Sequence, residues 1–122
     1  MESSNAVEAF GALAQPTRLA VFRLLVKAGP EGLAAGAIAE ELGVPHNTLS
    51  SHLGVLARAG LISARRQSRS IIYSADLAGT RALLTFLVAD CCNGRPEICS
   101  PLVEIAERAC CNARPARRKA SR

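Results

Sequence analysis

The amino-acid sequence predicts one mostly α-helical domain with a single β-hairpin. Apolar residues recur at helical spacing through most of the first 60 positions. The spacing changes to short β-like runs at Leu61–Arg65 and Ser70–Ser74, and it returns to a helical pattern after Leu77. The chain has 122 residues, of which 49% are apolar, which is enough for one compact domain with a small core.

Two helices are expected in the first 28 residues, before a loop at Gly29–Gly32. The first covers Asn5–Leu13, and the second begins at Pro16, because proline is tolerated at the first helical position. The expected apolar faces are Val7, Phe10 and Leu13 on the first helix and Leu19, Phe22, Leu25 and Val26 on the second.

Two further helices are expected on either side of a three-residue turn. The earlier one covers Ala35–Leu42 and stops at Gly43, and the later one runs to Ala59 with Asn47 as its expected N-cap. On the later helix three leucines recur at i, i+4 and i+7, so they should face the core: Leu49, Leu53 and Leu56. The outward residues are Asn47, Thr48, Ser51 and Val55, flanked by Ser50 and His52.

The expected hairpin has a cationic tip, and two more helices follow it. One covers Leu77–Cys92, and a last short helix runs from Ser100 to about Cys110. The apolar stripe of the longer helix is Leu83, Leu84, Leu87 and Val88. We expect residues 1–111 to form the domain, with a cysteine-rich segment at 90–111, and residues 112–122 to be a basic, disordered tail.

The position of the charges is more informative than their sum. The net charge is +5, but residues 1–111 hold ten basic and ten acidic residues, so the whole excess lies in the tail. Between Glu41 and Asp76 there is no acidic residue, and this stretch carries Arg58, Arg65, Arg66 and Arg69. A local surface of this kind is suited to a phosphate backbone.

Helix, short turn, helix and basic hairpin follow one another as in a winged helix-turn-helix. The small polar side chains of the second helix are suited to base edges in the major groove, and Val55 to a thymine methyl group. The hairpin arginines Arg65, Arg66 and Arg69 are expected at neighbouring phosphates or in the minor groove. We therefore predict a protein that binds double-stranded DNA.

Three segments carry a resemblance to the ArsR/SmtB family of metalloregulatory repressors. They are Ala14–Leu19, Ile38–Gly43 and Ser50–Leu61, and the last looks like the family's S-x-H-L-x-x-L-x-x-A-G-L recognition-helix signature. The resemblance covers roughly residues 8–92. It implies a homodimer, formed by the first and the long fifth helix, on an imperfect palindrome in a promoter. It also implies that an inducer lowers the affinity for this operator.

The inducer is expected at the cysteines. All five lie within 21 consecutive positions: Cys91, Cys92, Cys99, Cys110 and Cys111. The paired cysteines of the best-known arsenite repressors are replaced here by Gly43 and Pro45, and no histidine lies on the long helix for a zinc site. Thiolates bind soft ions, and the segment resembles a divergent group of arsenic repressors. Our hypothesis is an As(III) site at the first three cysteines, with the last two as additional candidates.

Several alternatives stay open at the cysteines, while other functions are not expected. Antimonite or methylated As(III) are alternative inducers, and a disulfide switch or a Cd, Pb or Zn site would use the same thiols. We expect no organic cofactor and no catalysis, because the Cys111–Arg117 spacing of a phosphate loop comes without its glycines. No signal peptide or membrane span is visible, so we expect a cytoplasmic protein whose cysteines stay reduced.

Overall fold

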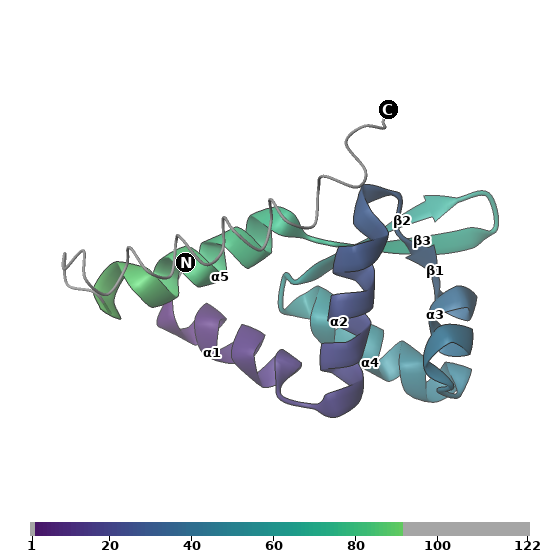
Figure 1. Cartoon of the computed structure of the whole chain (residues 1–122), viewed down its shortest axis with the longest axis horizontal. Helices are drawn as coiled ribbons and strands as arrows, with labels where there is room; N and C mark the ends of the chain where they lie inside the picture. The colour runs from purple at the N-terminus through teal and green to yellow at the C-terminus, as the bar shows by residue number, and fades with distance from the viewer. Residues whose placement is uncertain (1, 92–122) are drawn as a thin grey trace. The chain divides into compact units, whose positions relative to one another are not determined.

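A computed structural model of the chain describes residues 2–91, with side chains to Val88. Residues up to Phe86 form one compact unit, and the following residues are assigned to a second. The elements, drawn in Figure 1, are α1 (Ser3–Leu13), α2 (Pro16–Ala28), the 3₁₀ turn η1 (Gly29–Glu31), β1 (Leu33–Ala34), α3 (Ala35–Leu42), α4 (His46–Arg58), β2 (Ile62–Gln67), β3 (Ser70–Ala75) and α5 (Leu77–Cys91). The predicted mostly helical fold with one hairpin is confirmed, whereas the helix expected from Ser100 and the basic tail lie outside the described residues.

The sheet has three antiparallel strands in the order β1-β3-β2. Strands β2 and β3 are the predicted hairpin, paired from Ile62 with Ala75 to Gln67 with Ser70. Strand β1 pairs Leu33 with Tyr73 and was not predicted, because two residues are too few to show an alternating pattern. It pairs with the middle of β3 and lies directly before the start of α3.

The hydrophobic core lies where the helices meet the base of the sheet. All three leucines predicted to face inward from the later helix, Leu49, Leu53 and Leu56, are buried. They pack in one cluster with Val21 and Leu25 of α2, Ile38 of α3, Leu61 and Ile62 before and within β2, and Leu83 of α5. The i, i+4, i+7 spacing therefore identified the inner face of α4 correctly.

The predicted apolar faces of the first two helices are partly wrong. Helix α1 buries three alanines, Ala6, Ala9 and Ala12, while Val7 is 70% exposed and Phe10 is 43% exposed. On α2 the buried residues are Val21 and Leu25, whereas Leu19 and Val26 are exposed. The physical reason on α1 is close packing, since only small side chains fit where this helix contacts α2 and α4. Val7 and Phe10 lie on the surface of the domain, whereas Leu13 is partly buried against the core, as predicted.

Local hydrogen bonds define the ends of the helices. Asn47 is not the N-cap of α4, because the helix begins at His46, two residues earlier than predicted. Pro45 is the N-cap, and its carbonyl accepts from the Leu49 N–H at 2.9 Å. Asp76 is placed to cap α5, since its Oδ1 accepts from the Gly79 N–H at 3.0 Å and its own N–H donates to the Leu61 carbonyl at 2.8 Å. No helix among residues 2–91 is long and apolar enough to cross a membrane.

Candidate nucleic-acid interface

Helices α3 and α4 form a helix-turn-helix around a tight turn. Gly43 ends α3 in the left-handed conformation, with φ 66° and ψ 37°, and the Val44 N–H donates to the Ala39 carbonyl at 3.1 Å. Pro45 follows in an extended conformation and directs the chain into α4. The turn and the contact between α3 and α4 fix the direction of the second helix relative to the first.

The outward face of α4 is built from short polar side chains. Asn47, Thr48, Ser50 and Ser51 are all exposed, as the sequence predicted. The Asn47 Oδ1 accepts from the Thr48 N–H at 2.9 Å, which satisfies one of the free amide groups in the first turn of the helix. Val55 is half-buried and packs partly against the core, so it offers less surface than its neighbours. The exposed group can donate and accept hydrogen bonds without any repulsive carboxylate.

The structure divides the three hairpin arginines into two groups. The Arg65 guanidinium donates to the Glu31 carbonyl at 2.9 Å and to the Pro30 carbonyl at 3.4 Å, which holds it against η1. Side chains alternate along a strand, so Arg66 lies on the opposite face of the hairpin from Arg65. Arg69 lies beside Ser68 in the two-residue turn, and both Arg66 and Arg69 are exposed.

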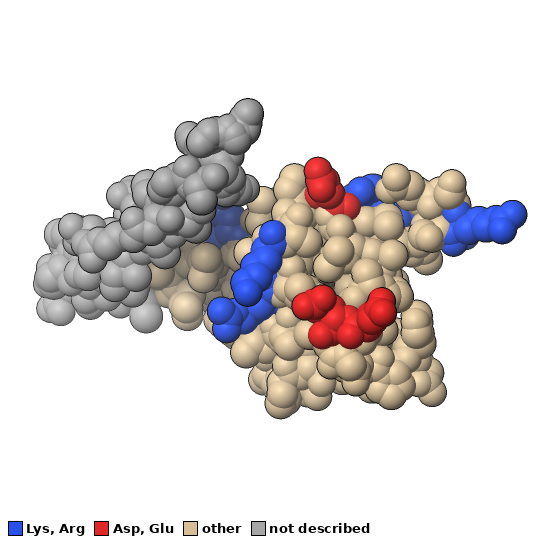
Figure 2. Space-filling view, turned by 45° about the vertical axis from the view of Figure 1, so that its right-hand side comes forward, with Lys and Arg blue, Asp and Glu red and all other residues tan. Residues whose placement is uncertain are grey.

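The charge distribution over this part of the molecule is uneven. Figure 2 shows Lys and Arg side chains at the far right, where the hairpin tip lies, and acidic side chains nearer the middle of the view. The exposed carboxylates Glu40 and Glu41 belong to α3, and no acidic residue lies from there to Asp76. Helix α4 and the hairpin therefore present amide, hydroxyl and guanidinium groups together, which is the chemistry that a nucleic-acid backbone and base edges require.

One functional candidate was missed in the sequence. Arg18 of α2 donates through Nε to the Ala12 carbonyl at 2.5 Å and through Nη2 to the Gly11 carbonyl at 3.2 Å. Its Nη1 lies 3.4 Å from Nδ1 of His52, a half-buried residue of α4. The two residues are 34 positions apart in the sequence, in two separate motifs, and no local pattern predicts that their side chains meet.

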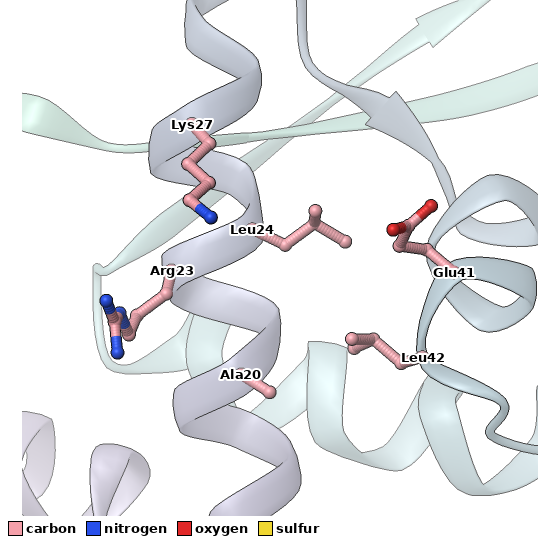
Figure 3. Close-up of a pocket in the computed structure, with 6 residues that line it drawn as sticks. All are labelled: Ala20, Arg23, Leu24, Lys27, Glu41 and Leu42. Atoms are coloured by element: carbon pink, nitrogen blue, oxygen red, sulfur yellow. The ribbon is translucent and has the colours of Figure 1, made fainter. Parts of the chain in front are cut away.

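A shallow hollow of about 300 Å³ lies between α2 and α3. Figure 3 shows Arg23 and Lys27 on one wall and Glu41 on the other, with Ala20, Leu24 and Leu42 between them. Leu24 and Leu42 are partly buried against the core here, and none of the lining residues belongs to α4. The hollow thus adds nothing to the interface described above.

The cysteine hypothesis falls almost wholly outside the described residues. Cys91 is the last residue of α5, and its side chain is not described; Cys92, Cys99, Cys110 and Cys111 lie beyond the described part of the chain. Among the residues that are described, no group of three His, Cys, Asp or Glu side chains could hold a metal ion. The three-thiolate site stays a prediction from the sequence.

Comparison with known proteins identifies the same segment. The family model for a helix-turn-helix domain matches residues 13–64, which include α2, α3 and α4. The nodulation protein NolR of Rhizobium meliloti is 41% identical over 65 residues, which are 53% of this chain and 51% of that protein. The chain spans about half the length of the curated relatives it matches first, at 51% and 57%.

Solved structures extend the likeness to the hairpin. A homodimeric winged helix-turn-helix DNA-binding domain from Mycobacterium bovis, described as a possible ArsR-family transcriptional regulator, is 30% identical with a TM-score of 0.59, over 71% of this chain and 80% of that one. A possible transcriptional regulator for arsenical resistance is 26% identical with a TM-score of 0.59, over 67% of this chain and 82% of that one. The winged helix-turn-helix fold is therefore shown.

Proposed function

The chain belongs to the ArsR/SmtB family of winged helix-turn-helix transcriptional regulators, and from this premise we propose that it is a homodimeric repressor that binds operator DNA. The observation that carries the proposal is the outward face of α4. The leucines of this helix are buried on its inner face, which leaves Asn47, Thr48, Ser50 and Ser51 exposed. Helix α4 enters the major groove, and these side chains meet base edges.

The hairpin supplies the contacts that position α4. Arg66 and Arg69 bind phosphates beside the major groove or reach into the minor groove, and this fixes orientation more than sequence preference. Arg65 contributes chiefly by holding the hairpin against η1. Base recognition thus comes from one helix and electrostatic affinity from the strand pair beside it.

Exposed apolar side chains on the outer helices support the homodimer. Val7 and Phe10 on α1, and Leu77 and Leu84 on α5, are between 43% and 70% exposed, so both helices offer apolar surface to a partner. A second copy of the chain that covers them would bury this surface symmetrically. A two-fold dimer also places two α4 helices about one DNA turn, roughly 34–36 Å, apart.

The inducer proposed for this repressor is trivalent arsenic bound to Cys91, Cys92 and Cys99. Thiolates suit As(III), which takes three sulfur ligands in a pyramid, and all five cysteines are close together in the sequence. One structural neighbour is described as a possible regulator for arsenical resistance, which supports the proposal. Gathering three thiolates at the end of α5 would reorganise the dimer, and a coupling free energy of about 3 kcal/mol lowers operator affinity roughly 100-fold.

Fluorescence anisotropy on promoter DNA tests this proposal under reducing conditions. Arsenite is expected to release the wild-type protein, and the Cys99→Ser variant is expected to bind DNA equally well but to ignore arsenite. A variant with both Cys110→Ser and Cys111→Ser is the matched control, since it also lacks thiols of the same segment. Release that survives Cys99→Ser and disappears in the control would contradict the assignment of the site.

A thiol redox switch is the competing function, and the same assay separates it. Peroxide would oxidise two thiols to a disulfide while it is itself reduced to water, and a thiol reductant would restore DNA binding. Release by peroxide without release by arsenite would replace the arsenic proposal. Release by Cd²⁺, Pb²⁺ or Zn²⁺ alone would instead assign a divalent-metal site to these sulfurs.

A further inference from the structure

Arg18 joins three helices at one point of the fold. Helix α1 has no basic residue in its last turn, and its last four carbonyl groups have no i+4 partner, although the Gly11 carbonyl accepts from the Ala14 N–H at 3.2 Å. The guanidinium of Arg18, from α2, binds two of these carbonyls, those of Gly11 and Ala12. A cation at this position also interacts favourably with the helix dipole. Arg18 therefore replaces the C-terminal cation that α1 does not carry itself.

The third contact of the same guanidinium is to α4. Its Nη1 lies 3.4 Å from the His52 Nδ1, and a guanidinium has N–H donors but no acceptor. The contact is attractive when Nδ1 carries a lone pair, and in a neutral imidazole this arrangement puts the ring proton on Nε2. The imidazole is thereby left with one donor, Nε2–H, of the kind that a phosphate oxygen or a base acceptor accepts.

We propose that Arg18 is a positioning residue for operator binding, one that links the end of α1 to α4 through His52. The proposal rests on the proposed DNA-binding function and adds a connection through which the position of α1 controls operator affinity. Helices α1, α2 and α4 pack against one another, and Arg18 is half-buried between them. A displacement of α1, whose outer face carries Val7 and Phe10, changes the carbonyls that hold Arg18 and through it the setting of His52.

Operator affinity of paired variants tests the link. Arg18→Gln is expected to weaken operator binding about tenfold relative to Arg23→Gln, because charged hydrogen bonds of this kind are individually strong. Arg23→Gln is the matched control, since it removes the same charge from an exposed position of the same helix. Equal affinities of the two variants, with wild-type binding intact, would overturn the inference and leave the proposed function standing.

A pair of substitutions distinguishes the roles of the two ring nitrogens of His52. His52→Asn keeps an acceptor near the position of Nδ1, whereas His52→Gln reaches only toward Nε2. Arg18→Gln is therefore expected to weaken binding in the His52→Asn background but to have almost no further effect in the His52→Gln background. Additive losses in both backgrounds would show that Arg18 acts only on stability. If wild-type protein binds no promoter DNA, the proposed function fails, which is a different outcome.

A spectroscopic signature tests the same link without any variant. Nitrogen-15 NMR of the histidine side chains in the wild-type protein is expected to show the Nε2–H tautomer for the neutral ring of His52. His46, which is exposed at the first position of α4, serves as the internal reference. Finding the Nδ1–H tautomer for the neutral ring of His52 would contradict the proposal, even if the Arg18 variants did not fold.

Discussion

The salt dependence of DNA binding distinguishes the hairpin arginines. Each phosphate contact that a protein makes releases counterions, so the logarithm of affinity falls with the logarithm of salt by about 0.9 per contact. A dimer carries two hairpins, and Arg66→Gln therefore removes two contacts and reduces the slope by about 1.8. Arg65→Gln is expected to leave the slope nearly unchanged, because its guanidinium is held by the Pro30 and Glu31 carbonyls.

The assay is fluorescence anisotropy on one promoter duplex at several KCl concentrations. Arg65→Gln is the matched control for Arg66→Gln, since the two residues are adjacent on β2 and lose the same charge. The control should instead lower the free energy of unfolding, because it breaks the contact between the hairpin and η1. Equal slopes for the two variants, or a larger change for Arg65→Gln, would contradict the assignment of the phosphate contact to Arg66.

Three further predictions concern the fold and the dimer. Gly32→Ala should lower the free energy of unfolding by roughly 3 kcal/mol or more, since φ is 72° and the added methyl group collides with the Tyr73 carbonyl. Gly43→Ala, whose methyl group meets open space, should lower it by only about 1 kcal/mol. Equal losses for the two variants in urea unfolding would contradict this prediction. Leu53→Ala should lower the free energy of unfolding by about 2–5 kcal/mol in the same experiment, and a loss below 1 kcal/mol would argue against the burial of this leucine. Phe10→Glu should yield a folded monomer in analytical ultracentrifugation, and an unchanged dimer would exclude α1 from the interface.

Much of the fold follows from local patterns in the sequence. The helical spacing of apolar residues, together with Pro16 at a helix start and Gly43 at a helix end, located the helices within a few residues of their observed ends. The leucines of α4 were assigned to the core because their spacing repeats on one helical face. The polar outer face of that helix followed from the same spacing.

What could not be predicted depends on packing between elements. The alanine face of α1 is buried because neighbouring helices approach closely, and no periodicity rule ranks alanine above Phe10 for burial. The partners of Arg65 and Arg18 are backbone carbonyls of distant segments, which carry no sequence signal. The division of the hairpin arginines required the register of β2 against β3.

Base recognition by α4 is tested most directly by a comparison of two DNA duplexes. Anisotropy titrations would use the chain's own promoter and a scrambled duplex of the same length, at one physiological salt concentration. A repressor that reads bases through α4 should bind the promoter at least about 10³-fold more tightly, with one dimer bound per site. Equal affinity for both duplexes would mean that α4 reads no bases, and it would contradict the assignment of the chain as an operator-binding repressor.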